Sequence, residues 1–264
     1  MVDILKRVFL AFSSGEGVEK VGGSLPPACN ALLVGEQRIC RSLLLLAAVT
    51  AAAQAGMAVQ FFAQAEIPRL PVCLQRCVPN VSPESLKKIK FSYPGTLAEL
   101  LQQVARLHES GSLEPSPPSL IIVDRLEGFL AGPGPGLTRE LSSAAHLAAL
   151  LCDTAAFLTS ILERRVSSSA SCRVLASFQS EDVAWSSSLL QSPPVLDVLD
   201  RYFSGRCTLD RDSSYEAAAS GLQEIWNIYF SGPGVSEASS SAVDAQWQLL
   251  VGADDSMEFK LTKR

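Results

Sequence analysis

The chain has 264 residues and a formal net charge of −5, and 47% of its residues are hydrophobic while 19% are charged. This length and composition allow one large core and exclude a mostly disordered chain. The negative charge excludes binding of polyanions through the overall field, so any contact with nucleic acid must come from a local basic patch or from a partner.

The first predicted element is an amphipathic helix over residues 1–13, where apolar residues recur at helical spacing before a glycine-rich stretch. We interpret residues 1–28 as an amphipathic segment with a flexible tether, and residues 29–264 as the core with its C-terminal edge strands. Two alternatives stay open for the segment. It docks on a partner through Phe9 and Phe12, or it packs against its own core.

The rest of the chain first alternates strands with helices. The predicted strands are residues 31–34, 59–63, 89–93, 120–123, 173–178 and 207–209, and the predicted helices are residues 42–54, 96–108, 138–165 and 194–203. Strands joined by crossover helices form a parallel sheet. Three final strands, residues 225–230, 247–251 and 258–261, lack intervening helices and predict an antiparallel extension at one edge. The sequence therefore predicts an α/β fold, with a mostly parallel sheet flanked by helices.

A degenerate phosphate-binding loop lies between the first core strand and the next helix. In a P-loop, glycines let backbone N–H groups wrap the phosphates, a lysine bridges them and a hydroxyl holds magnesium. Residues 35–42 keep the frame, with Gly35 first and Ser42 eighth, but Cys40 replaces the second glycine and Arg41 the lysine. A Cβ penalises the backbone that glycine adopts, and a guanidinium is wider than an ammonium. This interpretation rests on the position of residues 35–42 between a strand and a helix more than on their match to the P-loop motif.

Three further positions complete the site of a RecA-type P-loop NTPase. Asp124 ends an aliphatic strand, where this class places a carboxylate near magnesium, although a buried strand can also end in an ordinary Asp. Gln179 follows a later strand, at the position of a sensor for the γ-phosphate. The general base is expected at Gln64, with Glu66 two residues later. Because Cys40 and Arg41 alter the phosphate loop, we expect ATP with magnesium to bind weakly or not at all. Because an amide cannot act as a general base, we expect any hydrolysis to be slow.

Four separated segments carry a more specific resemblance. They are SLKKIKFSYP at 85–94, SLIIVDRLEGFL at 119–130, ALLCDTAA within 148–156 and VLDRYF at 198–203. Together they resemble the vertebrate SWIM-type zinc-finger protein-associated ATPases, which are divergent RecA-family recombinase paralogues and subunits of Shu-type complexes. The resemblance implies a RecA-like P-loop NTPase core.

The resemblance also implies a nuclear accessory protein, or mediator, of homologous-recombination DNA repair. The implied partners are a SWIM-type zinc-finger protein in an obligate-like heterodimer, the strand-exchange recombinase with its paralogues, and single-stranded DNA. Where the family's phosphate loop is intact it ends in Gly-Lys-Ser/Thr, and this chain has Cys40, Arg41 and Ser42 there. Two readings stay open: an adaptor with a degenerate ATP site, and an active DNA-stimulated ATPase whose nucleotide state gates partner exchange.

Contacts with recombinase and DNA have their own predicted residues. RecA recombinases recognise each other through a Phe-x-x-Ala segment, and Phe12 lies ahead of the core as that segment does, with glycine in place of the alanine. The loop after Gln179 offers Trp185 for stacking on a base, but it carries two carboxylates and no Lys or Arg. The densest basic cluster is Lys87, Lys88 and Lys90, a pattern more typical of a solvated face. We expect the chain alone to bind DNA weakly.

No metal site and no membrane contact are predicted. Seven cysteines, an odd number in apolar stretches, indicate reduced and mostly buried thiols in an intracellular protein. Cys73 and Cys77 stand four apart, but no second Cys or His pair follows at zinc-site spacing. The longest apolar run, residues 43–53, is shorter than the roughly 20 residues that span a bilayer.

Overall fold

The computed structural model describes residues 2–13, 30–67, 70–77, 81–113, 117–131, 136–165, 170–179, 193–214, 223–232 and 245–263. The helices are α1 (Val2–Ala11), α2 (Gln37–Gln54), α3 (Val72–Cys77), α4 (Pro83–Leu86), α5 (Leu97–Leu113), α6 (Leu126–Leu130), α7 (Leu137–Arg165) and α8 (Pro194–Leu199). The strands are β1 (Ala31–Val34), β2 (Val59–Phe62), β3 (Ile89–Ser92), β4 (Leu120–Val123), β5 (Arg173–Phe178), β6 (Gly205–Arg211), β7 (Glu224–Ser231), β8 (Ala245–Val251) and β9 (Met257–Lys263).

All these strands belong to one nine-stranded sheet, in the order β3-β2-β4-β5-β1-β6-β7-β8-β9. The strands from β3 to β6 pair in parallel, and those from β6 to β9 pair antiparallel. The predicted parallel sheet with an antiparallel extension at one edge is therefore confirmed. The parallel strands are separated by crossover helices, whereas no helix is described between the last four strands.

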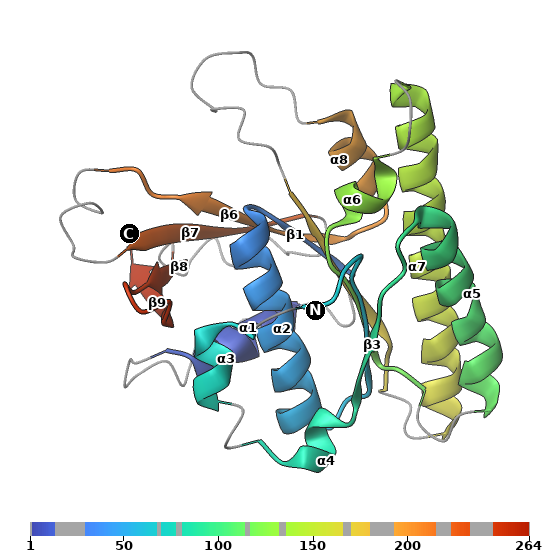
Figure 1. Ribbon diagram of the computed structural model, residues 1–264, viewed down its shortest axis with the longest axis horizontal. Coiled ribbons are helices and arrows are strands. Elements are labelled where there is room, and N and C mark those ends of the chain that lie inside the picture. The colour runs from blue at the N-terminus through green and yellow to red at the C-terminus, as the bar shows by residue number, and fades with distance from the viewer. Residues whose placement is uncertain are drawn as a thin grey trace.

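Helices cover both faces of the parallel part of the sheet (Figure 1), with α1 and α2 on one face and α5 and α7 on the other. Side chains along a strand point alternately to the two faces. In the central strand β1, Leu33 therefore packs with α2, while Leu32 packs with the cluster around α7. Strand β1 is thus buried on both faces, as its unbroken aliphatic sequence predicts.

Local signals set several helix ends. The Glu99 N–H donates to Thr96 Oγ1 at 3.2 Å, as a capping box predicts, while the Glu99 carboxylate accepts from the Gly95 N–H at 2.8 Å. Gly56, at φ 65°, follows the end of α2 in the left-handed conformation that glycine adopts readily. Between β2 and β3, where no helix is predicted from the sequence, the structure has α3 and α4, the latter capped by the Ser82 hydroxyl.

Helix α1 packs on the core, so the second alternative for the N-terminal segment holds. Phe9 has no exposed surface, and its ring stacks on Phe259 with centroids 4.5 Å apart. The prediction that Phe9 binds a partner is therefore wrong, because a fully buried ring cannot reach one. Phe12 is half-buried, and its carbonyl oxygen accepts from the Phe259 N–H at 3.0 Å. Its partner role stays a prediction, and the tether lies outside the described residues.

Among the described residues, one helix, α7, has the length and the apolar composition that would allow it to cross a bilayer. Its apolar face packs instead against the sheet and the neighbouring helices. The buried residues are Ala144, Leu147, Ala148, Leu151, Thr154, Ala155, Leu158, Ile161 and Leu162. This packing accounts for the composition of α7 as a core helix.

Candidate functional site

The predicted nucleotide-site residues gather at one edge of the sheet. Gly35, Asp124 and Gln179 each follow directly after a strand, at the ends of β1, β4 and β5, and Gln64 lies two residues beyond β2. The carboxyl ends of parallel strands meet at the same edge, where open α/β sheets bind their ligands. The candidate site therefore lies between this edge and the start of α2.

The predicted phosphate loop is a helix, which corrects the expectation that the helix begins at residue 42. Helix α2 begins at Gln37, only two residues after Gly35. The Cys40 N–H donates to the Glu36 carbonyl at 2.9 Å, and later N–H groups bond within the helix in the same way. A P-loop instead points the N–H groups of several loop residues at the phosphates. The cradle for a polyphosphate is therefore absent from this segment.

Gly35 has a packing role. Its N–H donates to the Phe178 carbonyl at 3.3 Å, so this group is not free for a phosphate. A Cβ added at this position would lie 2.8 Å from Leu209 Cβ on β6. Glycine is required here by the close approach of β6, and a phosphate group is not needed to explain it.

Arg41 pairs with Asp124, which joins the start of α2 to the end of β4. The Arg41 Nε donates to Asp124 Oδ2 at 2.7 Å, and the Asp124 side chain is only 1% exposed. The other carboxylate oxygen accepts from Ser177 Oγ at 3.2 Å. Ser42 Oγ donates to the Arg38 carbonyl at 2.9 Å within the helix. The basic, acidic and hydroxyl groups predicted for phosphate and magnesium therefore bond to the protein itself.

A second set of polar groups continues from this pair. With its amide oriented to satisfy both guanidinium groups, Gln37 accepts from Arg41 Nη2 at 2.9 Å and from Arg125 Nη1 at 3.3 Å. Glu127 accepts from Arg125 Nε at 3.1 Å and from the Gln179 N–H at 2.9 Å. Burial raises the pKa of the Glu127 carboxyl above its usual value, although these hydrogen bonds oppose the change. The predicted sensor Gln179 is thus held through its backbone on α6.

Carboxylates surround the first turn of α2. Arg38 pairs with Glu224 on β7, with Glu36 at 3.5 Å and with Asp255 at 3.7 Å. Glu224 also accepts from the indole N–H of Trp226 at 3.0 Å. These negative charges lie where a helix N-terminus would otherwise attract an anion, so they oppose a polyphosphate.

Gln64 and Glu66, the two residues predicted near the general-base position, are not placed to act as a general base. Gln64 Nε2 donates to the Gly128 carbonyl at 2.8 Å, which fixes the amide against α6. Glu66 is exposed. Among the described residues, no group of three or more His, Cys, Asp or Glu side chains could hold a metal ion. With Arg41 bonded to Asp124 and the Gln64 amide bonded to Gly128, these side chains do not fit ATP with magnesium.

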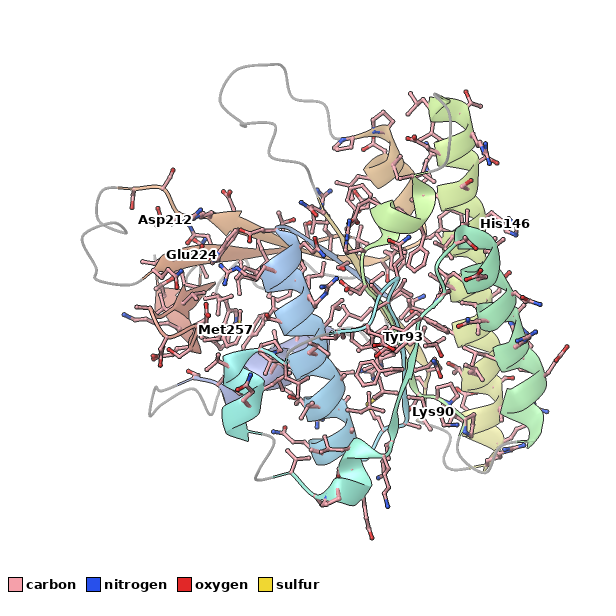
Figure 2. All side chains as sticks on the ribbon, in the orientation of Figure 1. Lys90, Tyr93, His146, Asp212, Glu224 and Met257 are labelled. Carbon is pink, nitrogen blue, oxygen red and sulfur yellow. The ribbon has the colours of Figure 1, made fainter. Side chains whose placement is uncertain are left out.

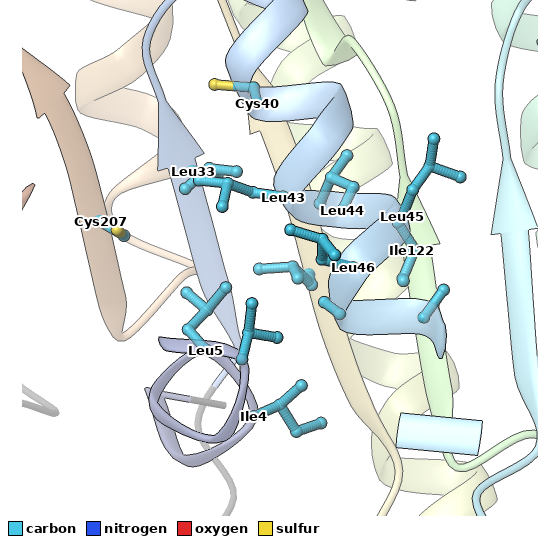
Figure 3. Packing of buried hydrophobic residues seen from close by; sticks show 14 of the residues in the cluster. Ile4, Leu5, Leu33, Cys40, Leu43, Leu44, Leu45, Leu46, Ile122 and Cys207 are labelled. Atoms are coloured by element: carbon cyan, nitrogen blue, oxygen red, sulfur yellow. The ribbon is translucent and has the colours of Figure 1, made fainter. Parts of the chain in front are cut away.

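The thiol of Cys40, which replaces a P-loop glycine, is buried. It points from α2 to the side of β1 and β6, where Cys207 lies (Figure 3). Burial raises the pKa of Cys40 well above its usual value and that of Cys172 to about 12. These thiols are therefore protonated and unreactive at neutral pH.

Sequence reasoning missed four residues of this site, namely Gln37, Arg125, Glu127 and Ser177. Gln37 and Arg41 stand four apart, so a helix starting at Gln37 would have put them on one face. Arg125 and Glu127 follow directly after Asp124 and were visible as charges beside the expected site. Trp185, the predicted stacking residue, lies outside the described residues.

Two known proteins are related to this chain in sequence, and a solved structure shares its fold. No family model matches the chain. ATPase SWSAP1 of Mus musculus is 33% identical over 215 residues, covering 81% of this chain and 68% of the mouse protein. ATPase SWSAP1 of Homo sapiens is 32% identical over 184 residues, covering 69% of this chain and 72% of the human protein.

Among solved structures, the KaiC-like protein PH0186 of Pyrococcus horikoshii OT3 matches with a TM-score of 0.57 and 12% identity. The match covers 94% of this chain and 97% of that chain. At this identity the likeness concerns the fold alone. The predicted RecA-like fold class is confirmed by this match.

Proposed function

The chain belongs to the family of the ATPase SWSAP1, as the four sequence segments predict, and from this membership we propose a nuclear accessory protein of homologous-recombination DNA repair. The protein binds a SWIM-type zinc-finger partner and supports the strand-exchange recombinase and its paralogues on single-stranded DNA. It acts by holding partners and does not depend on ATP turnover. The observation that carries the last point is the start of α2 at Gln37, in place of a phosphate loop.

The chemistry of the site supports an adaptor over the alternative, a DNA-stimulated ATPase whose nucleotide state gates partner exchange. Hydrolysis needs a held polyphosphate, a cation and a group that activates water. Here Arg41 and Asp124 bind each other, and the Gln64 amide bonds to Gly128. An amide cannot accept the proton of an attacking water.

We expect no thermal stabilisation by Mg-ATP. A ligand that binds only the folded state at 100 times its Kd adds about 2.7 kcal/mol, which corresponds to roughly 5–10 °C for a chain of this size. Melting curves of the purified chain with and without millimolar Mg-ATP measure this directly, with a RecA-type ATPase that has an intact loop as control. A clear shift at micromolar ATP would show that the site binds nucleotide and would favour the ATPase alternative.

The adaptor role is tested by capture from cells. Affinity purification of the tagged chain, followed by mass spectrometry, should recover a SWIM-domain protein and recombinase subunits. Recovery should be the same after apyrase treatment and with added Mg-ATP. Recovery of neither partner would contradict the adaptor role, and a nucleotide-dependent yield would favour the gated ATPase.

The edge of the sheet at β3 is the surface that we assign to the partner. Among the described residues β3 pairs only with β2, so one backbone edge of β3 is open. Phe91 on β3 and Tyr93, the first residue after it, are 40% and 41% exposed, and their rings stack with centroids 6.4 Å apart. Figure 2 labels Lys90 on this strand and Tyr93 just beyond its end. An open edge with exposed aromatic rings favours an added strand from another protein.

An apolar hollow of about 150 Å³ adjoins this edge and specifies the partner segment further. It is lined by Leu45, Ala48, Val49, Leu70, Leu74, Leu86, Ile89 and Phe91. Lys87, Lys88 and Lys90 are next to lining residues in sequence, and all three are exposed. The surface therefore suits an extended partner segment with one apolar anchor and acidic neighbours. A nucleobase would lose hydrogen bonds in so apolar a hollow, which disfavours DNA there.

Substitution at this edge should weaken partner binding. Phe91→Ala combined with Lys87→Glu should reduce affinity for the SWIM partner by about tenfold or more, because an anchor and a charge contact are both lost. Tyr229→Ala, at an exposed tyrosine on β7, is the matched control. Unchanged partner affinity would remove this surface from the proposal. Loss of single-strand binding by the chain alone, followed by fluorescence anisotropy, would assign the edge to DNA.

A further inference from the structure

The buried carboxylate of Asp124 needs a positively charged partner in the candidate site. Its side chain is only 1% exposed, and a buried carboxylate without a positive neighbour is strongly destabilising. In P-loop NTPases the neighbouring positive charge is magnesium, held beside the phosphates. In this chain it is the guanidinium of Arg41, whose Nε lies 2.7 Å from Asp124 Oδ2.

We propose that Arg41 is the permanent counter-ion of Asp124 and stands in for the magnesium–nucleotide. The arrangement of α2, β4 and β5 that a bound nucleotide would stabilise is then held by the chain's own side chain. This inference goes beyond the adaptor role, because it concerns the folding of the chain alone. It would stand even if the proposed partners were wrong.

Hydrogen bonds fix both members of the pair. The second Asp124 oxygen accepts from Ser177 Oγ at 3.2 Å, and that hydroxyl accepts from the Arg125 N–H at 2.9 Å. Gln37, four residues before Arg41 on the same helix, accepts from Arg41 Nη2 at 2.9 Å. The guanidinium thus bonds in two directions at once, which a single ammonium group on a lysine could not match in geometry. The replacement of lysine by arginine is therefore explained by this pair.

The two partners differ in burial, and this difference gives the inference a directional test. The Arg41 side chain is 30% exposed, whereas that of Asp124 is 1% exposed. Loss of the arginine leaves a buried carboxylate without its positive partner. Loss of the carboxylate charge leaves a guanidinium that can turn towards solvent. Removal of Arg41 should therefore be the more damaging change.

Melting temperatures in nucleotide-free buffer measure this asymmetry. Arg41→Gln should lower the melting temperature by roughly 5–10 °C, and Asp124→Asn should lower it less. The double variant should melt close to Asp124→Asn alone, because the two residues act as one pair. Arg38→Gln, on the same helix, is the control and should change little: the Arg38 side chain is 43% exposed, and its partner Glu224 keeps Arg211 and the indole N–H of Trp226. If Arg41→Gln does not fold, Arg41→Lys replaces it: this variant keeps the charge but not the guanidinium geometry, so it should lower the melting temperature by less, and a wild-type melting temperature would contradict the need for arginine.

A magnesium titration tests whether Arg41 stands in for the cation. Millimolar MgCl2 should restore part of the loss in Arg41→Gln and leave the wild type and the double variant unchanged. NaCl at equal ionic strength should not restore it, since Asp124 is shielded from bulk salt. The inference is overturned if Arg41→Gln melts like the wild type, or if the two single losses add in the double variant. If NaCl restores the melting temperature of Arg41→Gln as much as MgCl2 does, or if MgCl2 does not restore it, Arg41 does not stand in for magnesium.

Discussion

Phe9→Ala should lower the free energy of unfolding by about 3–5 kcal/mol, since it removes a fully buried ring and leaves a cavity. The ring lies between α1 and the antiparallel strands, with centroid distances of 4.5 Å to Phe259, 5.3 Å to Trp247 and 6.0 Å to Phe230. For a chain of this size the loss corresponds to a fall in melting temperature of about 10 °C. Urea unfolding followed by tryptophan fluorescence measures it, since Trp247 reports on the same cluster.

The matched control is Leu10→Ala, one residue further along α1. Leu10 is 47% exposed, so its truncation should change the free energy of unfolding by less than about 0.5 kcal/mol. A Phe9→Ala chain that unfolds like the wild type but loses its partners would contradict the packing of α1. It would restore the docking role predicted for Phe9.

Gly35→Ala should destabilise the fold by about 1–3 kcal/mol through overpacking. The new Cβ would meet Leu209 Cβ at 2.8 Å and the Leu209 carbonyl oxygen at 3.2 Å, so β1 and β6 would have to separate. Because the glycine serves packing, the loss should appear in nucleotide-free buffer and should not change with Mg-ATP. Thermal unfolding of the variant in both buffers measures this.

Gly136→Ala is the control for a glycine with room beside it. A Cβ there would lie 3.7 Å from Arg139 Cβ, an ordinary contact distance, so we expect little change. A Gly35→Ala chain as stable as the wild type would show that β6 yields easily. A loss seen only with Mg-ATP present would instead give Gly35 the phosphate role that the sequence suggests.

The sequence by itself determined the order of the strands and of helices α1, α2, α5, α7 and α8, and the split between parallel and antiparallel pairing. These features depend on local patterns that hold regardless of context. The aliphatic run of β4 predicts a strand buried on both faces, and Thr96 with Glu99 predicts the start of α5. The positions of Asp124, Gln179 and Gln64 at one edge follow from the same reasoning, since parallel strands end together.

Only the tertiary structure decided how these residues are used. The frame from Gly35 to Ser42 predicts a loop, but contacts across the chain favour a helix from Gln37: Arg41 bonds to Asp124, 83 residues away, and Arg38 to Glu224, 186 residues away. An amphipathic α1 likewise fits a partner or its own core equally well. The aromatic side chains of β7, β8 and β9 decide for the core, because they supply the buried surface against which Phe9 packs. Pairings at such sequence separation leave no local pattern, so no periodicity or motif could have predicted them.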